Sequence, residues 1–136
     1  MGRRVVVTGL GTVNSLGNTV PEFWEGVKAG KSGIGPITKF DATGYPSRVA
    51  GEVKNFEATE RLDPKFAKRS DPFSHFALAS ALEAMRQAGL WDGEEPVDAF
   101  DPSRAGVVIG SGIGGFQSLG DAFKTLFDRG YERILP

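Results

Sequence analysis

Glycine is the residue that most constrains how this chain can fold. The nineteen glycines do not spread as they would in a linker but gather near positions 9–11, 30–35 and 110–115. Two of these clusters directly follow β-branched runs, Arg4–Thr8 and Val107–Ile109. An apolar run that does not alternate is typical of a strand buried on both faces, as in a parallel sheet. The clusters therefore predict tight turns at the ends of buried strands.

Helix signals separate these runs. Thr19 and Glu22 form a capping-box pair that predicts a helix over residues 20–29. Further helices are predicted over 72–88 and from Phe116 to about Arg129, each ending at a glycine. With a short strand expected at Arg48–Val53, strands and helices alternate along the chain, which predicts an α/β fold.

The helix predicted over 72–88 carries a stripe of small side chains. Asp71 is its predicted N-cap. Alanines recur at spacings of four, three and four residues, at Ala77, Ala81, Ala84 and Ala88. Such a stripe allows another element to pack close to the helix backbone. Leucines and a methionine follow the same period beside it, which predicts burial on more than one side.

Composition excludes several classes of function. Sixteen basic and seventeen acidic side chains give a net charge of -1, which does not indicate a nucleic-acid partner. The sequence has no cysteine and one histidine, His75, which excludes a disulfide framework, a Cys/His zinc site and a thiol nucleophile within these residues. The longest apolar run near the N-terminus, Val5–Val7, is too short for membrane insertion. We therefore expect a soluble, cytoplasmic protein without a bound metal.

Residues Gly110–Gly115 match the glycine spacing of a dinucleotide-binding loop. They follow a predicted strand and precede a predicted helix, as such a site requires. The acidic residue expected about twenty positions later, at the end of a second strand, is missing. Glycines that let the backbone pass close to another element explain the motif better, and a Rossmann-type nucleotide-binding half-domain remains an alternative. Ser111 is not at the centre of a Gly-x-Ser-x-Gly elbow, which rejects a hydrolase triad.

Positive charge gathers at Lys65, Lys68 and Arg69, with Arg61 upstream. Most such runs are solvated helix faces, and a binding surface is the less common alternative. His75 has no partner that spacing alone supplies, so we expect a structural or exposed histidine and not a catalytic one.

Several segments, in order along essentially the whole chain, resemble the N-terminal part of the β-ketoacyl-[acyl-carrier-protein] synthase II family. The resemblance is carried by residues 3–11, 16–19, 23–24, 29–37, 40–41, 50–53 and 107–115. The chain departs from the family pattern at Asn14-Ser15, and at Ser70 and Pro72. Pro72 bears on whether the helix before Asp71 continues unbroken into the next one.

The resemblance implies a thiolase-like, layered α/β/α/β/α architecture, of which residues 1–136 would form the N-terminal half, and a homodimer when the protein is full length. It also implies a decarboxylative Claisen condensation that extends an enzyme-bound acyl group with malonyl-carrier protein. Acyl carrier protein and acyl and malonyl thioesters would be the partners, and no cofactor is expected. The nucleophilic cysteine and both catalytic histidines are expected beyond Pro136, so this chain alone is expected to be inactive.

The resemblance assigns roles to a few residues of this sequence. Ile113 matches a position that lines and limits the acyl-chain pocket. Four basic residues match positions that meet the acidic carrier protein: Lys65, Lys68, Arg69 and Arg133. A non-catalytic, chain-length-factor-like homologue from polyketide synthesis is a further alternative.

Overall fold

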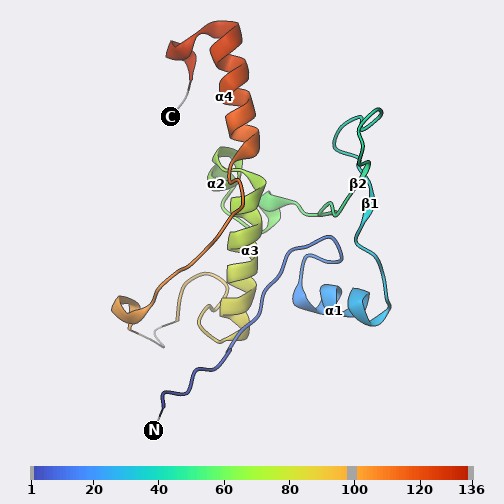
Figure 1. Ribbon diagram of the computed structural model, residues 1–136. Helices are drawn as coiled ribbons and strands as arrows, with labels where there is room; N and C mark the ends of the chain where they lie inside the picture. Colours follow the sequence, from blue (N-terminus) through green and yellow to red (C-terminus); the bar gives the residue numbers. More distant parts are fainter. Residues whose placement is uncertain (1, 98–100, 135–136) are drawn as a thin grey trace.

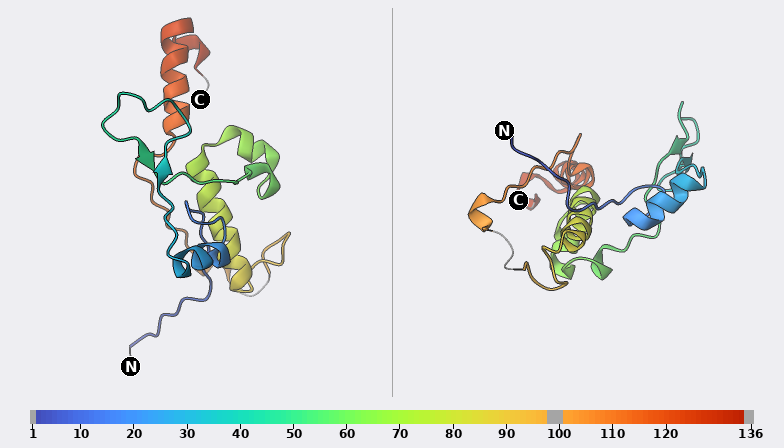
Figure 2. Two further views of the ribbon diagram at one scale, coloured as in Figure 1. Left: turned by 90° about the vertical axis from the view of Figure 1, so that its right-hand side faces the viewer. Right: turned by 90° about the horizontal axis from the view of Figure 1, so that it is seen from below.

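The computed structural model describes residues 2–97 and 101–134 (Figure 1). Its elements are, in order, α1 (Val20–Lys28), β1 (Gly35–Pro36), β2 (Val49–Ala50), the 3-10 turn η1 (Ala58–Glu60), α2 (Pro64–Arg69), α3 (Pro72–Gln87), the 3-10 turn η2 (Pro102–Arg104), α4 (Phe116–Arg129) and the 3-10 turn η3 (Tyr131–Arg133). Helix α3 lies at the centre, α2 lies at its N-terminal end, and α4 extends beyond that end (Figures 1 and 2).

The N-terminal segment packs very closely against the face of α3 that carries the alanine stripe. A Cβ atom built on Gly9 would clash with the Ala84 carbonyl and lie 3.2 Å from the Ala88 Cβ. A Cβ on Gly11 would clash with the Ser80 carbonyl. The alanine stripe therefore has the role predicted from its spacing, and its partner is the glycine-containing segment after residue 8.

Two polar side chains of α3 satisfy backbone amides of the same N-terminal region. The Glu83 carboxylate accepts hydrogen bonds from the Thr12 amide at 2.9 Å and from the Val20 amide at 2.8 Å. The Gln87 side-chain oxygen accepts from the Leu10 amide at 2.5 Å. Because Val20 is the first residue of α1, Glu83 also places a negative charge at the positive end of that helix.

The predicted start of α1 is confirmed. The Thr19 hydroxyl accepts from the Glu22 amide at 3.3 Å, as a capping residue does. The Glu22 carboxylate reaches back to the Asn18 amide at 2.7 Å, one residue earlier than in a standard capping box. The helix ends at Lys28, and Gly30 then adopts a φ of +62°.

Helices α2 and α3 are separate. Ser70, with φ -129° and ψ 155°, is extended, and Pro72 begins α3. Asp71 occupies the predicted N-cap position, but its side chain makes no capping hydrogen bond to α3. Its carboxylate bonds to α4 instead, which the local sequence pattern did not predict.

The predicted strands at Arg4–Thr8 and Val107–Ile109 are wrong for the described chain. Neither segment forms a strand, and Val5 is 94% and Val108 99% exposed. A strand needs backbone partners on at least one side, and the described residues provide none for these segments. The sheet that does form has two short antiparallel strands, with Gly35 opposite Ala50 and Pro36 opposite Val49.

Little of the apolar surface is buried. The buried apolar residues of the described chain are Ala42, Leu62 and Ala79, so the prediction that α3 is buried on several sides is also wrong. The total accessible surface is 11157 Å², whereas a compact monomer of this mass exposes about 6,900 Å². An apolar face of α4 is exposed as well: Phe116, Leu119, Phe123 and Phe127.

Substituting Gly11 by alanine should destabilise this arrangement. The added methyl group would strike the Ser80 carbonyl, which belongs to helix backbone and cannot move easily. We expect the free energy of unfolding to fall by about 1–3 kcal/mol, measured by urea unfolding at submicromolar concentration with tryptophan fluorescence. Gly106→Ala is the matched control, because a Cβ there has nothing within 4 Å. Equal stability of the Gly11→Ala variant and the parent would contradict the close approach.

The isolated 136-residue chain should self-associate. Its exposed apolar segments include a full helix face and two extended β-branched runs, which is the kind of surface that drives association. Light scattering should show oligomers or aggregates that grow with concentration. A monodisperse monomer at high concentration would show that these surfaces are tolerated in water.

Candidate functional site

Three of the basic residues singled out above lie on α2. Asp63 caps this helix, accepting from the Lys65 and Phe66 amides at 2.9 Å each, and Pro64 occupies its first turn. Lys68 and Arg69 fall in the last turn, where positive charge complements the helix dipole. The side chains of Lys65, Lys68 and Arg69, which we call the α2 basic cluster, are all exposed.

Part of the α2 basic cluster borders a groove at the junction of α2, α3 and α4. The groove has a volume of about 360 Å³. Its lining combines both signs of charge: Ala67, Lys68, Arg69, Ser70, Asp71, Pro72, His75, Gln117, Ser118 and Asp121. Within the described residues, an ion pair joins Lys28 to Glu25, and none joins the α2 basic cluster to an acid.

His75 contacts the end of α2. Its Nε2 lies 3.1 Å from the Ser70 hydroxyl oxygen, and the Ser70 hydroxyl donates to the Phe66 carbonyl at 2.6 Å. The imidazole also packs edge-on against the Phe66 ring. These contacts connect α3 to α2 and give His75 a structural role.

Asp71 links this junction to α4. Its Oδ1 accepts from the Ser118 hydroxyl at 2.7 Å, and its Oδ2 accepts from the Ser118 amide at 3.2 Å. Ser118 is the third residue of α4, and Gly115 before the helix has no side chain to cap it. Asp71 thus caps α4 from a distant part of the sequence, an interaction typically worth about 1 kcal/mol.

The glycine-rich loop ends at this cap. The Gly114 amide donates to the Ser111 hydroxyl at 3.0 Å, and Gly114 has a φ of +79°, which favours glycine. Ile113 is 75% exposed. It does not line the groove between α2, α3 and α4, nor the smaller cavity beside Arg61. A bound phosphate is disfavoured here, because the Asp71 carboxylate already occupies the α4 amide that an anion would use.

Arg133 lies apart from the α2 basic cluster. It belongs to η3, which follows the C-terminal end of α4, whereas the cluster lies near the N-terminal end (Figure 1). The 14 residues of α4 correspond to about 21 Å of helix. The structure therefore brings Lys65, Lys68 and Arg69 together but does not bring Arg133 to them.

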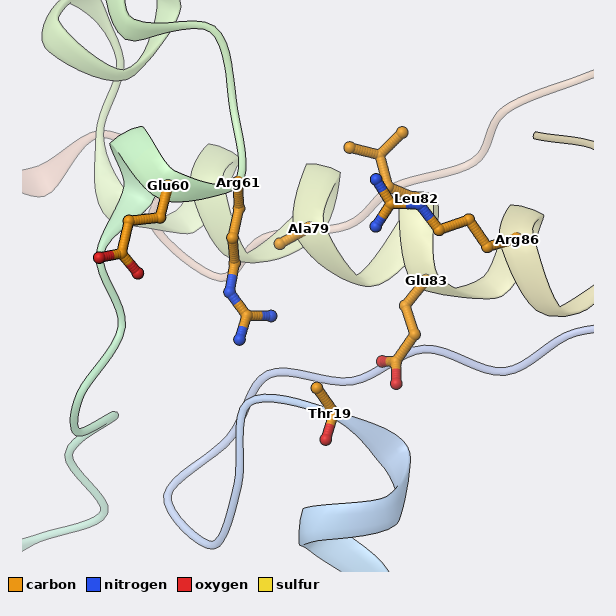
Figure 3. A pocket seen from close by; sticks show the side chains of 7 residues that line it. All are labelled: Thr19, Glu60, Arg61, Ala79, Leu82, Glu83 and Arg86. Carbon is orange, nitrogen blue, oxygen red and sulfur yellow. The ribbon is translucent and has the colours of Figure 1, made fainter. Parts of the chain in front are cut away.

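Arg61 belongs to a second cavity, of about 170 Å³ (Figure 3). Its guanidinium donates to the Asn18 carbonyl at 3.0 Å and lies 5.6 Å from the centre of the Phe56 ring. In Figure 3 it points toward Thr19 and Glu83. Arg61 therefore does not belong with the other basic residues, because its side chain bonds to the turn before α1.

The carboxyl groups of the described residues with clearly lowered pKa values lie outside the groove, at Asp41, Glu52, Glu57, Asp92 and Asp101. Hydrogen bonds from the hydroxyl and the amide of Ser103 hold the pKa of Asp101 below its usual value. Among residues 2–97 and 101–134, no helix combines the length and apolar character needed to cross a membrane.

Comparison with known proteins extends over nearly the whole chain. The family profile of the β-ketoacyl synthase N-terminal domain matches residues 2–135. The protein named 3-oxoacyl-[acyl-carrier-protein] synthase 2 of Synechocystis is 45% identical over 134 residues, which are 98% of this chain and 31% of that protein. Its namesake from Coxiella burnetii is 42% identical over 134 residues, again 98% of this chain and 31% of the relative.

A solved structure, the ishigamide ketosynthase/chain length factor, matches with a TM-score of 0.74 and 28% identity. The match covers 98% of this chain and 32% of that one. The backbone therefore follows the course of a ketosynthase, and the chain spans about a third of the length of these relatives. Since the family profile of the N-terminal domain matches almost every residue, the chain belongs to the β-ketoacyl synthase family.

Proposed function

We propose that this chain forms the N-terminal part of a 3-oxoacyl-[acyl-carrier-protein] synthase that elongates fatty acids. The observation that carries this proposal is the 45% identity over 134 residues to a protein of that name. The second observation is the exposed α2 basic cluster, which is unpaired within the described chain and suits an acidic partner.

The proposed reaction is a decarboxylative Claisen condensation. A cysteine thiolate attacks the acyl-carrier-protein thioester, which forms an acyl-cysteine and releases the carrier-protein thiol. Malonyl-carrier protein then loses carbon dioxide, and its carbanion attacks the acyl carbon, forms the new carbon–carbon bond and releases the cysteine thiolate. The 136 residues contain no cysteine, and their one histidine contacts Ser70. The nucleophile and two histidines would come from segments beyond Pro136, in a layered α/β/α/β/α homodimer working in the cytoplasm.

In this proposal the chain supplies three recognition sites. The α2 basic cluster would attract the acidic carrier protein, since charges arranged on one exposed surface raise the rate of encounter. Ile113 would limit the length of the bound acyl chain once other segments enclose the glycine-rich loop. Arg133 would meet the carrier protein at a second place, because it lies at the other end of α4.

A second candidate is a non-catalytic, chain-length-factor-like partner. It is favoured by the match to the ishigamide ketosynthase/chain length factor. The two candidates differ at the nucleophile position, where the synthase needs a cysteine.

The proposal is tested by condensation of acyl- and malonyl-carrier protein. The full-length protein should form the 3-oxoacyl product, whereas the 136-residue chain alone should not exceed a reaction without enzyme, because it lacks a thiol for the acyl intermediate. Product from the isolated chain would contradict the proposal that the catalytic residues lie outside these 136 residues. No product from the full-length protein would favour the chain-length-factor candidate.

Reversing Lys65, Lys68 and Arg69 to glutamate in the full-length protein should weaken carrier-protein binding by several-fold to about a hundred-fold. The loss should come mainly from slower association and should shrink as salt rises. Binding kinetics at several salt concentrations measure both effects.

The matched control reverses three other exposed lysines, Lys31, Lys39 and Lys54, which gives the same change of net charge. This control should bind the carrier protein nearly as the parent does. Equal loss of carrier-protein binding in both triple variants would attribute the effect to net charge alone. Unchanged binding in both variants would show that the α2 basic cluster is a solvated helix face and not a binding surface.

Replacing Ile113 by phenylalanine should shorten the longest acyl chain accepted, while the shortest primers react almost normally. Each methylene group that the pocket cannot hold loses about 0.8 kcal/mol of burial free energy. Condensation rates should therefore fall steeply once the acyl chain exceeds the length that the pocket accepts. Ile113→Ala should shift the limit in the opposite direction. Product profiles over a series of acyl-carrier proteins measure the limit, and an unchanged limit in both variants would remove Ile113 from the pocket.

A further inference from the structure

The Asp71–Ser118 contact joins two regions that the proposed function uses separately. Asp71 follows Arg69 of the α2 basic cluster by two residues. Ser118 lies in the first turn of α4, directly after the loop that carries Ile113. The contact therefore connects the surface proposed for the carrier protein with the loop proposed for the acyl chain.

Asp71 is held firmly enough to act as an anchor. Its backbone carbonyl accepts from the Ser74 amide at 2.9 Å in the first turn of α3, and its side chain is half-buried. Both carboxylate oxygens then bond to Ser118, one to the hydroxyl and one to the amide. A carboxylate that bonds to two donors of one residue fixes that residue in both distance and orientation.

Gly115 makes this approach possible. A Cβ atom at position 115 would lie 2.6 Å from the Asp71 Oδ2, well inside contact distance. The φ of Gly115 is -75°, so its own backbone conformation does not require glycine. A side chain at position 115 would have to displace the Asp71 carboxylate, so the contact in its present form depends on glycine here.

Among the described residues, the side-chain hydrogen bonds that connect α4 to the chain before residue 110 are those of Asp71 to Ser118. Within the loop, the bond from the Gly114 amide to the Ser111 hydroxyl fixes the turn around Ile113. This internal bond fixes the conformation of the loop, whereas the position of the loop relative to α2 and α3 depends on Asp71.

We propose that Asp71 is a positioning residue that sets the acyl-chain limit by holding the 110–115 loop through Ser118. This inference rests on the proposed function for the role of Ile113. Without the cap the first turn of α4 would fray and the loop would shift. Ile113 would then limit the length of the bound acyl chain less strictly.

The first measurement is amide hydrogen exchange of the full-length protein, which requires no catalytic activity. In the Asp71→Ala variant, amides from Ser111 to Ser118 should exchange about 2- to 30-fold faster, the range for loss of one capping interaction. Gly115→Ala should have a similar effect because its methyl group displaces the carboxylate. Ser118→Thr, which keeps hydroxyl and amide, should exchange like the parent.

The second measurement is the ratio of rates with the longest accepted acyl chain and with a short primer. Asp71→Ala and Gly115→Ala should raise this ratio at least threefold, and Ser118→Thr should leave it unchanged. Combining Asp71→Ala with Ser118→Ala should add little to either change alone, because both remove the same contact.

Asp101 and Ser103 provide a matched control elsewhere in the chain. Asp101 accepts from the Ser103 amide at 2.9 Å and from its hydroxyl at 2.7 Å, the same pair of donors, but within one turn. Asp101→Ala should change neither the exchange of residues 111–118 nor the rate ratio.

Unchanged exchange of residues 111–118 in Asp71→Ala would overturn the proposal. Faster exchange with an unchanged rate ratio would overturn the specificity role. If the parent protein condenses no acyl chain, the proposed function is wrong. The hydrogen-exchange measurement, which needs no activity, still decides whether Asp71 positions the loop.

Discussion

The close approach of the N-terminal backbone to helix α3 is the constraint on which the arrangement depends. Glycines at positions 9 and 11 allow the segment to lie directly on the alanine face, where a Cβ would strike helix carbonyls. At this distance Glu83 and Gln87 can reach the backbone amides of the segment. Since Glu83 also bonds to Val20, the same contact holds the start of α1 against α3.

Carboxylates at the two ends of α3 have related functions. Glu83, toward the C-terminal end, accepts from the first residue of α1, and Asp71, before the N-terminal end, accepts from the third residue of α4. Each places negative charge at the positive end of another helix and satisfies an amide that has no partner within that helix. α3 thus orients the helices around it by polar contacts where the apolar core is small.

Local sequence signals predicted the helices well because caps and stops depend on neighbouring residues. Thr19, Gly30 and Gly130 mark the ends of helices as expected. The strands predicted at Arg4–Thr8 and Val107–Ile109 do not form in the described chain, because a strand forms only where other strands supply hydrogen bonds and an apolar run alone does not show that such partners are present. Their apolar character is explained by the ketosynthase course of the backbone, in which we propose that both belong to a central sheet.

The contacts at the site join residues far apart in sequence, and for that reason periodicity did not reveal them. Asp71 was correctly placed before α3, but its bond to Ser118 spans 47 residues. A helix that starts after a glycine and lacks a capping side chain was the available signal that a distant residue caps α4. Arg61 is near Lys65 in sequence, but its side chain turns toward Asn18, which sequence proximity alone does not show.

We propose that this chain is one part of a ketosynthase and that other segments of that protein complete its sheet. Amide hydrogen exchange of residues 5–8 and 107–109, compared between the full-length protein and the 136-residue chain, tests it most directly. We predict exchange at least about a hundredfold slower in the full-length protein, because paired strands open only through larger unfolding events. Equally fast exchange of these amides in both proteins would contradict the claim.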